Sequence, residues 1–161
     1  MNNLLLVLDL QKSFINDNTK DLPKKIEQLI KLGQYDHVVF TRFINSENSI
    51  WYQRLNYRGC LSEEDKGIVI NTENYTVMDK NIYTAFNDQL IHYIKNNHID
   101  KIYLCGLETE CCVLKTALDL FENEYEVYVL EKYCACTHGK ERHDNAIKIL
   151  STTIGRNSII M

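Results

Sequence analysis

One cysteine of this chain is well placed for nucleophilic chemistry. Cys112 follows the segment 104–107, in which an apolar strand stops at a glycine, and an apolar-periodic helix begins within a few residues. Unpaired backbone N–H groups and the positive end of a helix dipole favour an anion at such a position, so we expect Cys112 to be biased toward its thiolate form. The position therefore predicts covalent catalysis.

Two polar residues that directly follow predicted strands could complete a catalytic set with this thiol. Asp9 follows the run 4–8, and Lys80 follows the run 75–78. We expect Cys112 to attack a carbonyl carbon, Asp9 to take the thiol proton and return it to the leaving group, and Lys80 to hold Asp9. Backbone N–H groups near the thiol would form the oxyanion hole. Taken singly, each residue has an ordinary explanation as a buried thiol, a turn cap or a solvated charge.

Strand-like and helix-like patterns alternate along the chain and predict how these residues are positioned. Apolar, β-branched runs predict strands at 4–8, 38–43, 75–78, 102–105, 127–130 and 158–160. Helical spacing of apolar residues occurs within 22–30, 86–94, 113–121 and 146–150. The alternation predicts a three-layer, doubly wound α/β fold with a mostly parallel six-stranded sheet, in one domain spanning 1–161. The stretch 45–66 breaks the alternation and is interpreted as a loop with a short helix.

In open parallel sheets, ligands bind beyond the carboxyl ends of the strands. Asp9, Lys80 and the turn 106–112 all fall at such ends. The sequence therefore predicts that residues far apart along the chain meet at one edge of the sheet.

Composition narrows the classes of function. The chain has 161 residues, 25% charged residues and a net charge of −4, which argues against a nucleic-acid partner. No apolar run approaches the roughly 20 residues of a membrane-spanning helix, so no membrane association is expected. Six cysteines without a recognisable secretory signal favour reduced thiols and a cytoplasmic location.

Three motifs along the chain occur together in one known family. They are Asp9-Leu10-Gln11 with Phe14, Lys80 followed by Tyr83-Thr84-Ala85-Phe86, and Gly106-x-x-Thr109-x-x-Cys112-Val113 with Thr116-Ala117. With these motifs the sequence resembles the isochorismatase-like cysteine hydrolases, a family that includes nicotinamidases, carbamoyl and ureido amide hydrolases and isochorismatases. The resemblance covers nearly the whole chain and implies a parallel six-stranded sheet.

The resemblance also implies roles for individual residues. Asp9, Lys80 and Cys112 match the family's catalytic triad, and the family's cis peptide bond maps onto Leu107 and Glu108. This bond would aim the Glu108 N–H at the oxyanion. A small amide or ureido C–N bond would then be cleaved through a thioester on Cys112, with no cofactor. By analogy with family members, a homo-oligomer is expected.

Further residues are candidates for a pocket around a small planar substrate. The resemblance suggests Gln11, Phe14, Trp51, Tyr52, Tyr83 and Phe86, with Arg42 or Arg54 to pair with a carboxylate. Nicotinamidases carry an aspartate and histidines after the second strand as metal ligands, whereas this chain reads Thr41-Arg42-Phe43-Ile44-Asn45-Ser46-Glu47 there. No metal site is therefore expected at that position, and nicotinamide is a less favoured substrate.

A cysteine and histidine cluster late in the chain has a second interpretation. Cys134-x-Cys136-x-His138, followed by His143, suggests a metal site, but its spacing differs from the usual pairs of structural zinc sites. We interpret it as a loop leading into the last helix, with His143 facing its neighbours. No metal is predicted.

Two other functions remain open. A vinyl-ether hydrolase of the isochorismatase type would rely on Asp9 and Lys80 and would not need Cys112. A catalytically silent protein of the same fold would use the pocket only to bind a small ligand.

Overall fold

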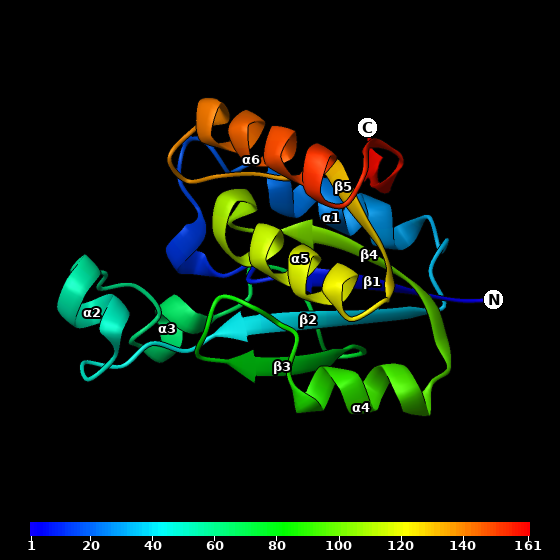
Figure 1. The fold of residues 1–161 in the computed structure, drawn as a ribbon. Coiled ribbons are helices and arrows are strands. Elements are labelled where there is room, and N and C mark those ends of the chain that lie inside the picture. The colour runs from blue at the N-terminus through cyan, green and yellow to red at the C-terminus, as the bar shows by residue number, and fades with distance from the viewer.

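The computed structural model describes residues 1–161 and contains one parallel sheet with helices on both faces (Figure 1). The strands are β1 (Asn2–Leu8), β2 (His37–Phe43), β3 (Thr76–Lys80), β4 (Ile99–Gly106), β5 (Glu126–Cys134) and β6 (Ile159–Ile160). Their order is β3-β2-β1-β4-β5-β6, and every neighbouring pair is parallel. The predicted fold class is confirmed, and the sheet is parallel throughout.

The strand order reverses between β1 and β4. The chain lays β2 and then β3 on one side of β1, returns to place β4 on the other side, and continues outward to β5 and β6. In the register, Leu8 at the end of β1 faces Gly106 at the end of β4. This reversal is a topological switch point, and Asp9 and the turn leading to Cys112 directly follow it.

The longer helices cover the two faces of the sheet because each buries one apolar side. In Figure 1, α1 (Leu22–Lys31) lies on one face, and α4 (Asp88–Asn96) and α5 (Leu114–Glu122) lie on the other. The last helix, α6 (Lys140–Thr153), packs against α5. Between these layers, β1 is buried from residue 4 onward, as expected for a central strand covered on both faces.

The segment 45–66 contains two short helices, so the prediction of a single short helix was wrong. They are α2 (Ile50–Leu55) and α3 (Glu63–Lys66). Each is preceded by an N-cap serine, Ser49 or Ser62, whose side chain accepts a hydrogen bond from a backbone N–H in the first turn. The segment forms a lobe beyond the carboxyl ends of β2 and β3 (Figure 1).

All six predicted strands are present, with shifted ends. β3 begins after Tyr75 and continues to Lys80, so the lysine is the last residue of the strand. Three single-turn elements complete the chain: η1 (Lys12–Phe14), η2 (Thr109–Val113) and η3 (Arg156–Ser158). None of the helices is both long and apolar enough to cross a lipid bilayer.

Candidate active site

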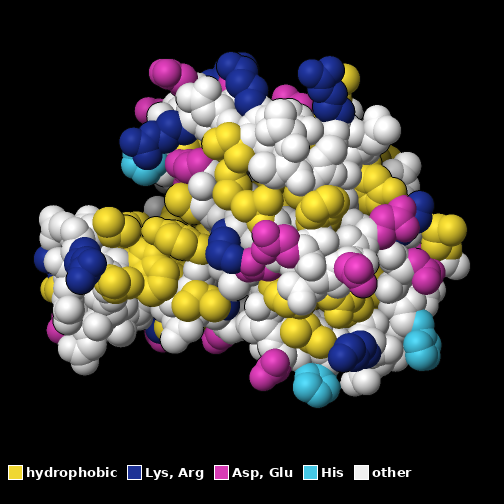
Figure 2. Space-filling view, in the orientation of Figure 1, with side chains coloured by type: hydrophobic (Ala, Val, Ile, Leu, Met, Phe, Trp, Pro, Cys, Tyr) yellow, Lys and Arg dark blue, Asp and Glu magenta, His cyan; other side chains and the backbone are white.

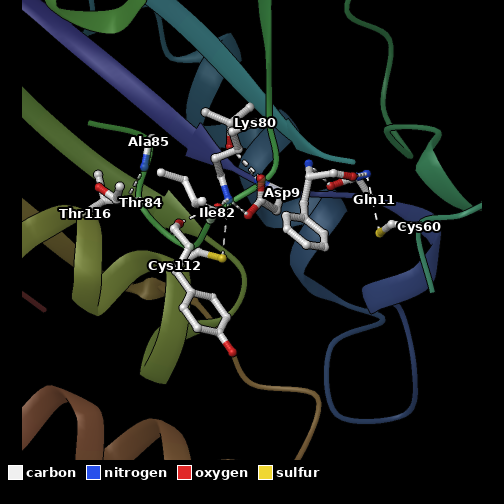
Figure 3. A network of polar contacts seen from close by, with 12 residues as sticks. Asp9, Gln11, Cys60, Lys80, Ile82, Thr84, Ala85, Cys112 and Thr116 are labelled. Atoms are coloured by element: carbon white, nitrogen blue, oxygen red, sulfur yellow. Dashed lines mark hydrogen bonds and ion pairs between the residues drawn. The ribbon is translucent and has the colours of Figure 1, made fainter. Parts of the chain in front are cut away.

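Asp9, Lys80 and Cys112 meet at the carboxyl edge of the sheet (Figure 3). The Lys80 Nζ lies 2.6 Å from Asp9 Oδ2 and 3.5 Å from Cys112 Sγ. It also donates to the carbonyl oxygens of Ile82, at 3.0 Å, and Tyr83, at 3.1 Å. All three side chains are buried. The ammonium is thus fixed between a carboxylate and a sulfur.

A hydroxyl on the neighbouring strand orients the Asp9 carboxylate. Thr41 Oγ1 donates to Asp9 Oδ1 at 2.7 Å and accepts from the Asp9 N–H at 3.2 Å. Thr41 lies in β2 beside β1, and it is buried. Sequence reasoning missed this residue, although a polar side chain inside an apolar strand next to the acid's strand was the available signal.

Opposing effects act on the Lys80 ammonium. Burial acts to lower the pKa of Lys80, but the charge of Asp9, the neighbouring Cys112 sulfur and hydrogen bonds to both outweigh it, so the pKa is raised. The lysine therefore stays charged inside the protein, where it neutralises the Asp9 carboxylate.

The Cys112 thiol is not biased toward the thiolate, so that expectation was wrong. The residue lies in the π-helical turn Thr109–Val113 that precedes α5, and it is almost completely buried. Burial raises the pKa of Cys112 well above its ordinary value, and the charge of Asp9 raises it further, while Lys80 lowers it. The resting group is a neutral thiol that needs a base, and Asp9 is the adjacent carboxylate.

The peptide bond between Leu107 and Glu108 is cis, as the resemblance implied. The Leu107 N–H donates to the Leu8 carbonyl at 2.8 Å, whereas the Glu108 N–H donates to no backbone or side-chain acceptor. Gly106 precedes this turn with φ +113°, and a Cβ there would lie 2.1 Å from the Leu8 oxygen. The close approach to Leu8 therefore requires glycine at position 106. The Glu108 N–H in the same turn remains free to donate a hydrogen bond.

A cavity of about 750 Å³ opens over Cys112. Its aromatic wall consists of Phe14, Phe43, Trp51, Tyr57 and Tyr83, and its charged or titratable lining of Arg58, Glu108, Glu110, His138 and Arg142. Figure 2 shows apolar side chains gathered on the lobe that contains α2. The cavity thus combines an apolar, aromatic side with a polar side.

Three of the predicted pocket residues, Phe14, Trp51 and Tyr83, line this cavity. Gln11 does not, because its buried amide binds backbone. It donates to the carbonyls of Phe43, at 2.9 Å, and Lys66, at 3.1 Å, and it accepts from the Phe43 N–H. Gln11 therefore clamps the end of β1 to β2 and α3, and the prediction of a substrate contact was wrong.

The remaining predicted pocket residues also lie elsewhere. Arg42 forms a two-pronged ion pair with Asp79 on β3, at 2.7 and 2.8 Å. Tyr52 stacks under the Arg58 guanidinium, 3.4 Å from the ring centroid, outside the cavity lining. Phe86 packs edge-on against Tyr125. None of these three residues lines the cavity.

The arginines that line the cavity are not the predicted ones. Arg54 is exposed and outside the lining, whereas Arg58 and Arg142 line it. They come from the lobe of α2 and from α6, which are far apart in the chain. Only the tertiary arrangement brings them together, so no local pattern in the sequence identified them.

The loop after β2 is organised by Asn45. Its side-chain amide donates to the carbonyls of Tyr57, at 3.1 Å, and Gly59, at 2.9 Å, and its oxygen accepts from Ser49 Oγ. The Asn45 side chain thus holds together, by hydrogen bonds, the segment that forms one wall of the cavity.

The late cysteine and histidine cluster does not converge as a set. Cys134 ends β5 and is buried in the core, and Cys136 lies beyond it. His143 is on α6, where its Nδ1 lies 2.8 Å from Thr109 Oγ1. The interpretation as a loop leading into the last helix, with His143 facing its neighbours, is confirmed.

The doubly wound parallel sheet, with polar residues gathered at its switch point, is the architecture of α/β proteins that bind ligands beyond the strand ends. A family model described as the Isochorismatase domain matches residues 3–157. The chain therefore belongs to the isochorismatase family.

Individual relatives are similar over different lengths. Isochorismatase family protein 2A from Dictyostelium discoideum is 41% identical over 70 residues, which cover 42% of this chain and 35% of that protein. The match thus spans about a third of that curated relative.

Solved structures match over the full chain. An isochorismatase-like hydrolase from Alkaliphilus metalliredigens has a TM-score of 0.85 at 18% identity, covering 100% of this chain and 95% of the other. A nicotinamidase/pyrazinamidase from Bacillus subtilis also has a TM-score of 0.85, at 20% identity, covering 100% of both chains. At these identities the structures show a shared fold.

Proposed function

We propose that this protein is a cysteine hydrolase that cleaves a small amide or ureido C–N bond. The observation that carries the proposal is the buried contact of the Lys80 ammonium with both Asp9 and Cys112 beside a cavity of about 750 Å³. A thiol, a carboxylate and a fixed cation are the groups that acyl transfer through a thioester uses.

Asp9 acts as the base in the first step of the proposed reaction. It takes the proton from Cys112 Sγ as the sulfur forms a bond to the carbonyl carbon, and the carbonyl π electrons move to oxygen. When the oxyanion collapses, the C–N bond breaks and Asp9 returns the proton to the departing nitrogen, which leaves as ammonia or an amine.

Water completes the proposed cycle. Asp9 takes a proton from the water that attacks the thioester carbon, the C–S bond breaks, and the thiol recovers its proton. The free Glu108 N–H supports this scheme because it is a backbone donor in the turn that carries Cys112, available to an oxyanion. Nucleophile, base and cation all come from side chains, so the steps need no cofactor.

The lining of the cavity favours a small, flat substrate. Trp51 and Tyr83 pack edge-to-face, with ring centroids 5.4 Å apart, on one side of it. Arg58 and Arg142 have no carboxylate partner within ion-pair distance and line the other parts of the cavity, where they can bind an anionic substituent. The structural likeness to a nicotinamidase/pyrazinamidase supports amide cleavage as the type of reaction.

Release of ammonia from a panel of small primary amides and ureido acids tests the proposal. We expect the wild-type protein and the Cys111→Ala variant to release ammonia, since Cys111 is a neighbouring thiol that also lines the cavity. Cys112→Ala and Asp9→Asn should each lose at least about 10³-fold in kcat.

Other outcomes would point to the alternatives. Turnover that survives Cys112→Ala but fails in Asp9→Asn would replace the thioester mechanism with the thiol-independent type. Binding of panel compounds with unchanged affinity in Cys112→Ala, and no ammonia from any protein, would favour a silent binding protein.

A further inference from the structure

Four side chains with metal-binding atoms converge on the polar wall of the cavity. They belong to Glu108, Glu110, Cys136 and His138, and one ligand atom from each lies within 4.8 Å of the others. The first two follow β4 and the last two follow β5. The carboxyl ends of β4 and β5 are adjacent because Gly106 pairs with Cys134 in the sheet.

Hydrogen bonds within this cluster leave two buried carboxylate oxygens without partners. The Cys136 thiol donates to Glu110 Oε1 at 2.7 Å, and the Thr137 N–H donates to Glu108 Oε2 at 2.8 Å. Glu108 Oε1 and Glu110 Oε2 are buried and accept no hydrogen bond. Glu108 is only 8% exposed. A buried, unpaired carboxylate oxygen is costly, so each of these two oxygens favours the binding of a proton or a cation.

No lysine or arginine lies within ion-pair distance of either carboxylate. The only cationic partner within ion-pair distance of either carboxylate is His138, whose Nδ1 lies 3.7 Å from Glu110 Oε1. His138 carries a positive charge only when protonated, and its side chain is 61% exposed. A cation bound by these carboxylates would supply the missing positive charge.

The types of donor select the class of cation. A thiolate and an imidazole together with carboxylates suit zinc-like transition metals, whereas magnesium and calcium prefer oxygen alone. Ligands of a tetrahedral zinc ion lie about 3.4 Å apart for bonds of ~2.1 Å. Here the four ligand atoms lie within 4.8 Å of one another, with Cys136 Sγ 2.7 Å and His138 Nδ1 3.7 Å from Glu110 Oε1.

We propose that Glu108, Glu110, Cys136 and His138 form a binding site for one zinc-like divalent ion. The ion would tie the turn after β4 to the loop after β5 in the wall of the cavity. Cys136 and His138, from the sequence motif after β5, thus provide two of the four ligands. The two glutamates, from the turn after β4, provide the others, and the buried Cys134 is not a ligand. The site does not depend on the proposed amide cleavage.

Titration with Co²⁺ tests the site without an activity assay. The Cys112→Ala protein is used, freed of metal and reduced, so that the thiol at the triad cannot bind the ion. We expect one Co²⁺ per chain, with a thiolate-to-cobalt charge-transfer band that Zn²⁺ abolishes by competition. On this background, Cys136→Ser should lose the band and Cys134→Ser should keep it.

A second variant tests the site in case Cys136→Ser does not fold. Because the His138 side chain is 61% exposed, His138→Ala should fold, and it should bind Co²⁺ at least about tenfold more weakly. A band that survives in Cys136→Ser, an affinity unchanged in His138→Ala, or failure of the Cys112→Ala protein to bind Co²⁺ would overturn the proposal.

Discussion

At the scale of single residues, the ion pair between Asp9 and Lys80 matters because it keeps a charged carboxylate next to Cys112. Both side chains are almost completely buried, and burying two charges costs free energy that their attraction offsets only in part. The pair is therefore a weak contributor to stability. Its chemical consequence is a charged carboxylate beside a neutral thiol.

The Thr41 hydroxyl should matter because it holds the Asp9 carboxylate in place. Thr41→Val keeps the shape and removes the donor, and a hydrogen bond to a charged group is worth about 1.5–3 kcal/mol. We expect kcat for the amide found in the panel to fall about tenfold or more with little change in KM. Thr41→Ser should restore most of the rate. Equal rates in the valine and wild-type proteins would contradict this positioning role.

At the residue scale, the sequence predicted which side chains come together where a motif combined residue type with a strand end. Asp9, Lys80 and Cys112 were predicted together and lie together. Gln11 was misassigned because its motif identifies a residue near the site, whereas its hydrogen bonds to backbone decide what the side chain does. The ionisation of Cys112 was misjudged because burial is a tertiary property.

At the scale of elements, the site depends on how closely β4 ends against β1. Gly106 makes this approach possible, since any Cβ would meet the Leu8 backbone. Gly106→Ala should destabilise the protein by about 2–5 kcal/mol through strain and overpacking. Urea unfolding provides the measurement.

Gly155 is the matched control for this prediction. It also has positive φ, at +95°, but a Cβ there would meet nothing within 4 Å. Gly155→Ala should therefore cost only the backbone strain, about 1–3 kcal/mol. Equal losses in the two variants would show that the close approach to β1 is not what requires glycine at 106.

Strands and long helices could be predicted because their apolar periodicity extends over several turns or alternations. The helices α2 and α3 could not be separated because they have only six and four residues, too short for periodicity to give a signal. The serine caps before them were the local signal that remained.

At the scale of the whole molecule, the cavity is formed by chain segments that meet only after the sheet is assembled. Trp51 comes from the lobe, Tyr83 from the loop after β3, and Arg142 from α6. Local patterns predicted the triad and the sheet, but most of the lining follows from the packing of these distant segments. This is why five of the eight candidate pocket residues, Gln11, Arg42, Tyr52, Arg54 and Phe86, do not line the cavity.

Buried thiols should make the stability of the whole protein depend on alkaline pH. Burial raises the pKa of Cys105 well above its ordinary value of 9.0. Above about pH 9 the unfolded chain loses this proton while the folded protein keeps it, so the folded state binds more protons and stability falls as pH rises. The expected slope is about 1.4 kcal/mol per pH unit for one thiol.

Comparison with a variant that lacks only the Cys105 thiol isolates this contribution. Cys105→Ala should be less stable at about pH 8 because it leaves a cavity, but its stability should fall less steeply between about pH 9 and 10.5. Urea unfolding under reducing conditions measures both profiles. Parallel profiles would contradict the raised pKa.

The most direct test of the central claim is to trap an acyl group on Cys112. The protein is mixed with p-nitrophenyl acetate, quenched in acid, and analysed by intact mass and peptide mapping. The proposed mechanism predicts one acetyl group, located on Cys112, absent in Cys112→Ala and retained in Cys111→Ala. Acetylation on Cys111 or spread over the lysines, with the same yield in Cys112→Ala, would contradict a nucleophilic role for Cys112.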